Sequence, residues 1–157
     1  DVLLISDEVY EHIVFDGAAH QSLLRRPALA ERAFVVSSFG KTYHVTGWKI
    51  GYCVAPPALT TEFRKVHQYV TFTSITPVQL ALADFLEAHP EHHLGLPAFY
   101  QGKRDRFCSL LEGSRFRFAP AAGTYFQLLD YSAVSEEDDV TLSRRLTVIM
   151  GSTSTCP

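Results

Sequence analysis

The sequence predicts an α/β fold in which helices cover a mostly parallel β-sheet, and three observations support this class. Two short apolar runs, Val2 to Ile5 and Ala33 to Val36, have the length and composition of strands buried on both faces of a parallel sheet. Each run ends in polar residues, and segments opened by proline with helical patterning follow later in the chain. Because ligands of open α/β sheets bind beyond the carboxyl ends of the strands, both polar tails are expected to carry chemistry.

The next elements are predicted by turn-forming residues. A third apolar run, 50–55, stops at two prolines, and the second of them can open a helix over 57–70. Further helices are expected over 77–88 and from about 97 to 111. We therefore expect three helices in succession after the third apolar run.

The pattern changes after the third helix. Residues 115–120 and 123–131 resemble two strands around a turn. The acidic segment "SEED" at 135–138 resembles a helix start, because acids favour the positive end of a helix. The last residues, from 151 on, resemble a solvated tail.

Composition is that of an ordinary globular protein, with 157 residues, 46% hydrophobic and 20% charged. A net charge of −3 without a basic block gives no reason to expect nucleic acid. Cysteines at 53, 108 and 156 form neither a disulfide framework nor a zinc pattern, which favours a reducing, cytoplasmic location. No signal peptide or membrane span is expected. The chain starts inside a predicted strand without a methionine, so we expect it to be a fragment.

The stretch "SSFGKTYHVTGWKIGY", at 37–52, surrounds two lysines with glycines, hydroxyls and aromatic residues at the end of a predicted strand. A lysine attacks carbonyl groups only when part of it is neutral, and burial or a nearby cation favours that state. Lys41 has such a setting, with Gly40 before it and Lys49 eight residues on. The nearby hydroxyls, backbone N–H groups and the Lys49 ammonium would suit a phosphate, and the glycines would let backbone approach a ligand.

The first strand tail supplies a carboxylate, Asp7, and a phenol, Tyr10. A reactive lysine, a fixed carboxylate, a phenol and a phosphate site together are what pyridoxal phosphate requires. Taken singly, each residue has a plainer explanation: Asp7 as a turn residue, Tyr10 as a packing residue, and Lys41 and Lys49 as surface charges. The combination on two strand tails favours a cofactor site.

"SDEVYEHIVFDG" followed by "SSFGKTYHVTGWKIGY" resembles the class I and II aminotransferases of fold type I, and most of all the methionine, glutamine and kynurenine aminotransferase group. The resemblance runs from residue 1 to about 148. It implies that Lys41 carries pyridoxal 5'-phosphate as an internal aldimine and moves the proton during transamination. It also implies that Asp7 pairs with the pyridinium nitrogen and Tyr10 bonds the ring hydroxyl, while Ser38 and Lys49 hold the phosphate.

The resemblance also implies a domain organisation and marks departures from the family. Residues 1–97 would be the C-terminal portion of the three-layer cofactor-binding large domain, and 98–157 part of an α+β small domain, with the boundary inside 92–113. Many relatives have arginine in place of Lys49 and serine in place of Gly40. The stacking ring, the upstream phosphate loop and the arginine that clamps the substrate carboxylate are absent from these residues, and after residue 148 the resemblance ends.

The implied function is transfer of an amino group from an amino acid to a 2-oxo acid by a homodimer when complete. Two alternatives stay open, a carbon–sulfur β-lyase using the same cofactor and a truncated product without activity. We expect no metal site, because Pro90 interrupts the histidines of 89–93. Tyr125 is expected to pack in the core, and Tyr43, His44 and Trp48 either pack beside the cofactor lysine or only wall its loop. The loop 71–77 resembles family loops that approach the partner subunit's site.

Overall fold

The computed structural model describes residues 2–150, which divide into two compact units. The first unit contains the residues up to Lys103 together with Ala122–Tyr125. The second contains Arg104–Ala121 and the residues from Phe126 on. The expected solvated tail lies outside the described residues, and the assignment of large and small domains stays a prediction.

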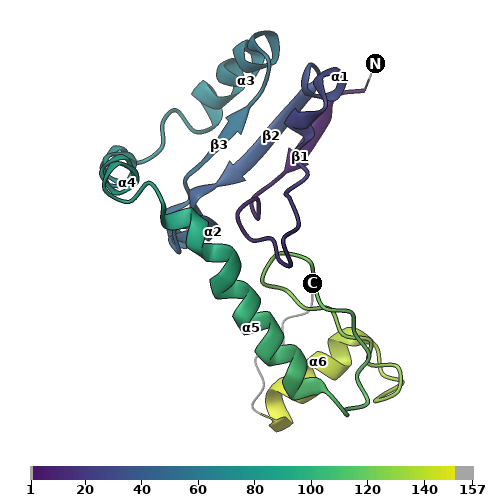
Figure 1. Cartoon of the computed structure of the whole chain (residues 1–157). Helices are drawn as coiled ribbons and strands as arrows, with labels where there is room; N and C mark the ends of the chain where they lie inside the picture. The colour runs from purple at the N-terminus through teal and green to yellow at the C-terminus, as the bar shows by residue number, and fades with distance from the viewer. Residues whose placement is uncertain (1, 151–157) are drawn as a thin grey trace. The chain divides into compact units, whose positions relative to one another are not determined.

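A mixed sheet of three strands lies in the first unit of the described chain (Figure 1). β1 (Leu4–Asp7) runs parallel to the middle strand β2 (Ala33–Ser38), and β3 (Gly51–Val54) runs antiparallel to β2 on its other side. The structure thus confirms all three apolar runs as strands. Because β3 is reversed, it begins at the edge of the sheet where β1 and β2 end.

The expected burial of the strands on both faces is wrong for this chain. In β2, Ala33 and Val35 are buried on one face, whereas Phe34 on the other face is half-buried, with its ring 6.2 Å from that of Phe63. In β1, Ile5 is 78% exposed. β1 has only one neighbouring strand in the described chain, and no described element covers the Ile5 side chain, so burial is confined to the middle strand.

The expected helices form within one residue of their predicted starts. α3 (Pro57–Val70) and α4 (Thr76–Ala88) each have a proline in the first turn, where the missing N–H has no helical partner to lose. α5 (Leu96–Leu111) also begins beside a proline. Five short helical segments complete the first unit: η1 (Leu23–Arg25), α1 (Pro27–Ala30), α2 (Phe39–Thr42), η2 (Thr46–Trp48) and η3 (His92–Gly95).

The loop 12–17 after β1 anchors a distant part of the chain. Ile13 and Phe15 are its buried side chains, each 1% exposed. The Phe15 N–H donates to the carbonyl of Ala122 at 3.0 Å, and the Ile13 carbonyl accepts from the Thr124 N–H at 2.8 Å. A Cβ on Gly123 would lie 2.8 Å from the Ile13 carbonyl oxygen, so this pairing requires glycine. The loop therefore fixes the backbone of 122–124 from a distance of over a hundred residues in sequence.

The second unit contains α6 (Asp139–Met150), which begins directly after the acidic "SEED" segment. The Asp138 carboxylate accepts from the Thr141 N–H at 3.0 Å and from its hydroxyl at 2.7 Å. This is the bonding of a helix N-cap. The predicted helix start is confirmed, and Leu142 on this helix is buried.

The two strands expected over 115–120 and 123–131 are wrong, since the structure has only isolated bridges in these segments. Arg117 and Asp130 form one bridge with two backbone hydrogen bonds. Near this bridge, the Gln127 side-chain amide accepts from the Ala121 N–H at 3.0 Å and donates to the Ala119 carbonyl at 2.8 Å. These two backbone groups are then not available for pairing with a neighbouring strand. Side-chain bonds to the backbone therefore replace sheet pairing here.

Within residues 2–150, no helix combines the length and the apolar character needed to cross a membrane. The same residues contain no group of three or more His, Cys, Asp or Glu side chains placed to hold a metal ion. Among the histidines of 89–93, His92 stacks on Tyr43 with ring centroids 5.3 Å apart, and His89 lies 4.8 Å from Phe85. These histidines take part in an aromatic cluster.

Candidate active site

The five residues singled out in the sequence line one cavity of about 480 Å³ at the edge of the sheet. β1 and β2 are parallel, so Asp7 and Ser38 both lie where these strands end. β3 starts at the same edge, and Lys49 directly precedes it. The cavity also contains Val9, Val36, Ser37 and Thr46, and the five predicted residues are Asp7, Tyr10, Ser38, Lys41 and Lys49.

Lys41 lies on α2, a single helical turn that follows β2. The Ser38 hydroxyl accepts from the Gly40 N–H at 3.0 Å and donates to the Ile50 carbonyl at 3.2 Å, which caps the turn. The Thr46 hydroxyl donates to the Gly40 carbonyl at 3.1 Å. A Cβ on Gly40 would lie 2.8 Å from the Thr46 Cα, so a larger residue here would push the loop apart. The absence of a side chain at Gly40 therefore lets the backbone of Thr46 approach closely.

Lys49 reaches the cavity through an unusual backbone conformation. Its φ of 54° and ψ of 45° are left-handed, and it ends the short helix η2. A lysine in this region costs about 1 kcal/mol relative to glycine, so the position is fixed by its surroundings. Its exposed ammonium is consistent with binding an anion by charge alone.

Asp7 is held at the strand end by a local bond and by a buried neighbour. Its Oδ1 accepts from the Val9 N–H at 3.2 Å. The next residue, Glu8, is buried, and its carboxylate contacts His20 Nε2 at 2.8 Å and the Leu23 N–H at 2.9 Å. Burial acts to raise the pKa of Glu8, but hydrogen bonds from His20, Leu23, Ser22 and Ser6 outweigh it and lower the pKa to about 2. Glu8 therefore stays charged and ties the loop 20–23 to β1.

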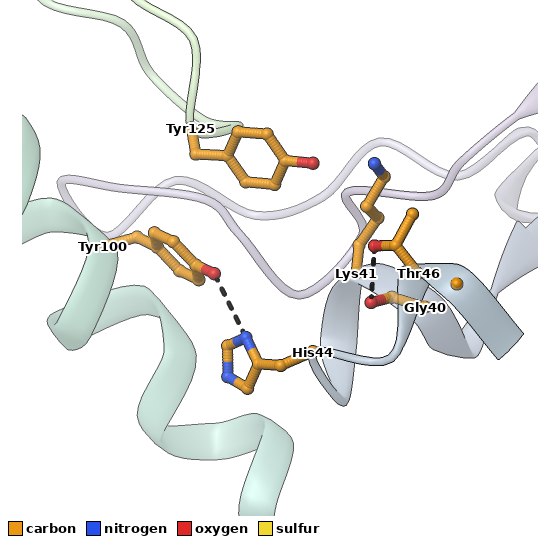
Figure 2. Close-up of a pocket in the computed structure, with 7 residues that line it drawn as sticks. Gly40, Lys41, His44, Thr46, Tyr100 and Tyr125 are labelled. Atoms are coloured by element: carbon orange, nitrogen blue, oxygen red, sulfur yellow. Dashed lines mark hydrogen bonds between the residues drawn. The ribbon is translucent and has the colours of Figure 1, made fainter.

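A second cavity, of about 500 Å³, shares Lys41 and Thr46 with the first. Figure 2 shows Lys41, His44, Tyr100 and Tyr125 around it. The Tyr100 hydroxyl lies 3.4 Å from His44 Nδ1, which joins α5 to the lysine loop. His44 thus faces a cavity beside the lysine, whereas Tyr43 packs against Phe39, Phe85 and His92.

Tyr125 is the residue of this site that sequence reasoning missed. It was expected in the core, yet it is 40% exposed and its ring centroid lies 5.5 Å from the Lys41 Nζ. Its ring also meets that of Tyr10 edge-on, with centroids 5.2 Å apart. Nothing in the local pattern of 123–131 distinguishes a packing tyrosine from one facing a cavity, because the contact is made through the distant loop 12–17.

The hydroxyls of these two tyrosines influence each other. Burial acts to raise the pKa of Tyr125, but its interactions with Lys41 and Tyr10 outweigh burial, and the pKa lies below its usual value. The pKa of Tyr10 is raised, first by burial and then by its hydrogen bond with Tyr125 and the charges of Tyr125 and Asp7. Tyr125 is therefore the member of the pair that loses its proton more readily.

The pattern of the family "Aminotransferase class I and II" matches residues 1–154. The chain belongs to the class I and II aminotransferases. It is 59% identical over 147 residues to a methionine aminotransferase of Escherichia coli (strain K12), covering 94% of this chain and 38% of that protein. It is 37% identical over 138 residues to a kynurenine–oxoglutarate transaminase of Dictyostelium discoideum, covering 87% of this chain and 32% of the relative.

Solved structures agree with this membership. An Escherichia coli structure described as having a methionine aminotransferase function superposes with a TM-score of 0.87 at 54% identity, covering 99% of this chain and 43% of that one. N-succinyldiaminopimelate aminotransferase from Mycobacterium tuberculosis gives a TM-score of 0.85 at 33% identity, covering 93% and 38%. The chain thus has part of the fold-type-I structure, and it spans less than half the length of these relatives.

Class I and II aminotransferases use pyridoxal phosphate, and the residues of the first cavity fit this cofactor. An amine, a carboxylate, a phenol and a second ammonium line a single space of about 480 Å³, within the size range of small-molecule sites. Ser38 fits less simply, because its hydroxyl proton is directed to the Ile50 carbonyl and must turn away to meet a phosphate.

Proposed function

We propose that the protein containing this chain is an aminotransferase that transfers an amino group from an amino acid to a 2-oxo acid, with methionine among its donors. The observation that carries this proposal is the single cavity lined by both strand tails. The 59% identity to the methionine aminotransferase of Escherichia coli supports methionine as a donor. Glutamine and aromatic or kynurenine-like amino acids are further candidate donors.

Lys41 and Asp7 are proposed to carry the central chemistry. The Lys41 amine would bind the cofactor's aldehyde and then move the proton of the amino acid's α-carbon. Asp7, at the end of β1, would keep the cofactor's ring nitrogen protonated. Bound pyridoxal phosphate supplies a ring that accepts electrons and so stabilises negative charge on the α-carbon. Tyr10 would donate to or accept from the ring hydroxyl.

Ser38 and Lys49 are proposed to hold the phosphate. Lys49 contributes a point charge, whereas an arginine would offer two parallel hydrogen bonds. The left-handed backbone at Lys49 is what brings its side chain to the cavity, so the charge and the conformation act together.

The finer architecture is proposed on family grounds. Residues 1–97 would belong to the cofactor-binding large domain and 98–157 to the small domain, and two copies of the complete protein would form a homodimer. The loop 71–77 would approach the partner's site. Gel filtration of the complete protein with light scattering tests the dimer, and a monomeric mass would contradict it.

The proposed activity is tested with the full-length protein and pyridoxal phosphate. Methionine, glutamine and kynurenine are each paired with a panel of 2-oxo acids, and the new oxo acid and amino acid are both quantified. A Lys41→Ala variant is the matched control and should show no transfer. Absence of transfer from all three donors would contradict the proposal. Release of pyruvate and ammonia from cysteine conjugates without a 2-oxo acid would instead support a carbon–sulfur β-lyase.

A further inference from the structure

We propose that Tyr125 is a positioning residue for Lys41, and that its ring and hydroxyl face the lysine amine and restrain it at the junction of the two cavities. The inference rests on the proposed function for the meaning of Lys41, but it concerns contacts within the protein alone. Lys41 and Thr46 line both cavities, so the side chain of Lys41 stands where they meet. A residue that holds the Lys41 amine at this junction determines which of the two cavities the amine faces.

The contact has two components. The Lys41 Nζ lies 5.5 Å from the centroid of the Tyr125 ring, within the range of a cation–π interaction. The Tyr125 hydroxyl also interacts with the Lys41 amine, and this interaction acts to lower the pKa of Tyr125. Figure 2 shows the phenol oxygen turned toward the lysine amine. Ring and hydroxyl thus act on the same amine, and a substitution can separate them.

The backbone clamp on loop 12–17 explains why Tyr125 stays in this place. Hydrogen bonds to Ile13 and Phe15 hold residues 122–124, and the neighbouring ring of Tyr10 packs edge-on against Tyr125. Gln101 of α5 bonds to Asp16 in the same loop at 2.9 and 3.2 Å. The loop 12–17 therefore holds Tyr125, with the ring of Tyr10 packed against it, beside the Lys41 amine.

A packing role alone does not account for these observations. Tyr125 leaves 40% of its surface exposed, which is more than a core tyrosine exposes. The titratable groups that interact with its hydroxyl are Lys41 from α2, Tyr10 from the segment after β1 and Tyr100 from α5, and the charge of Asp7 acts on Tyr10. Burial acts to raise the pKa of Tyr125, and the interactions with Lys41 and Tyr10 together outweigh it, so the hydroxyl and the amine are energetically linked.

The test measures the reactivity of the Lys41 amine in the full-length protein after removal of the cofactor. Acylation of Lys41 by a limiting reagent is followed by peptide mass spectrometry in wild type and Tyr125→Phe. Phenylalanine keeps the ring and removes only the hydroxyl, so the amine loses its polar neighbour in the cavity. Lys41 acylation is expected to be about threefold to tenfold faster, the range for the loss of one ordinary polar interaction.

Tyr100→Phe is the matched control, because Tyr100 lines the same cavity but directs its hydroxyl to His44. It should leave Lys41 acylation within twofold of wild type. In the cofactor-loaded protein, Tyr125→Phe should also shift the pH midpoint of the cofactor's absorbance change, and Tyr100→Phe should not. Equal Lys41 acylation in wild type and Tyr125→Phe would overturn the inference. The acylation readout needs no cofactor, so it remains decisive if the aminotransferase proposal fails.

Discussion

Ser38 and Gly51 lie opposite each other in the antiparallel pairing of β2 with β3. The pairing brings the start of β3 to the end of β2, so the chain between them forms one compact loop. Lys41 and Lys49 are both in this loop, and both line the first cavity. The two lysines are eight residues apart in the sequence, and the loop that holds them returns to the same edge of the sheet, so both reach one cavity.

Lys41 is expected to be the lysine that binds the cofactor. Borohydride reduction of the cofactor-loaded full-length protein should leave a pyridoxyl group on the peptide containing Lys41. Lys49 lines the same cavity and is the stringent internal control, while Lys65 pairs with Glu62 on α3. Recovery of the label on Lys49 and not on Lys41 would contradict the assignment.

Asp7→Asn is expected to keep the cofactor bound while lowering turnover by orders of magnitude. An amide cannot keep the ring nitrogen protonated, and the ring then stops accepting electrons. Asparagine retains an oxygen that can accept from the Val9 N–H, so the strand end should keep its shape. Steady-state kinetics measure the turnover, and a cofactor titration measures the binding of the cofactor. Asp84→Asn, at an exposed position of α4, is the control, and turnover within twofold of wild type in Asp7→Asn would refute the role.

Lys49→Ala is expected to weaken cofactor retention by about 1.5–3 kcal/mol, the loss of a hydrogen bond to a charged group. Lys49→Arg should retain more affinity, because it keeps the positive charge. Lys49→Gln separates charge from side-chain length, and it should behave like the alanine variant. Equilibrium dialysis with pyridoxal phosphate measures the affinity. An unchanged dissociation constant in Lys49→Ala would place the phosphate elsewhere.

Glu8→Gln is expected to destabilise the folded protein and to remove part of its acid sensitivity. The folded-state pKa of Glu8 is about 2, below its usual 4.5, so its carboxylate stabilises the fold at neutral pH. This contribution is complete above about pH 4.5 and is lost as the pH falls toward 2. At about 1.4 kcal/mol per pKa unit, it amounts to about 3 kcal/mol.

Urea unfolding of the full-length protein at several pH values between neutral and acidic checks this prediction. Glu62→Gln is the matched control, because Glu62 is exposed on α3 and pairs only with Lys65 among the ion pairs found in residues 2–150. Wild type and Glu62→Gln should lose stability together as the pH falls, whereas Glu8→Gln should lose less. Parallel curves for all three proteins would show that Glu8 carries no such contribution.

The 157-residue chain expressed alone is expected to show no aminotransferase turnover and only weak binding of pyridoxal phosphate. It spans 38% of the Escherichia coli methionine aminotransferase, and catalysis requires reacting groups held firmly in place. Large apolar side chains are exposed on it, including Tyr69 at 86% and Phe72 at 79%, which favours self-association. Size-exclusion chromatography, a cofactor titration and a methionine assay check this, and steady turnover by a monomer would contradict it.

The helices were accessible from the sequence because their signals are local. Prolines at 57 and 77 mark helix starts, the "SEED" segment caps α6, and apolar runs mark the three strands. The candidate site was predictable for a similar reason. Asp7 and Lys41 each follow a strand in the sequence, and parallel strands end at one edge of a sheet.

Only the tertiary structure decided the direction of β3, the exposure of β1 and the place of Tyr125. Each depends on contacts between residues far apart in the chain, which no local pattern contains. The segment 123–131 has the alternation of a strand, yet its Thr124 N–H donates to the Ile13 carbonyl, and the Gln127 side chain bonds the backbone of Ala119 and Ala121. The sequence by itself determined which residues could do the chemistry. The fold determined that Tyr125 faces Lys41, because the Tyr125 ring contacts the lysine amine only once the loop 12–17 has brought their segments together.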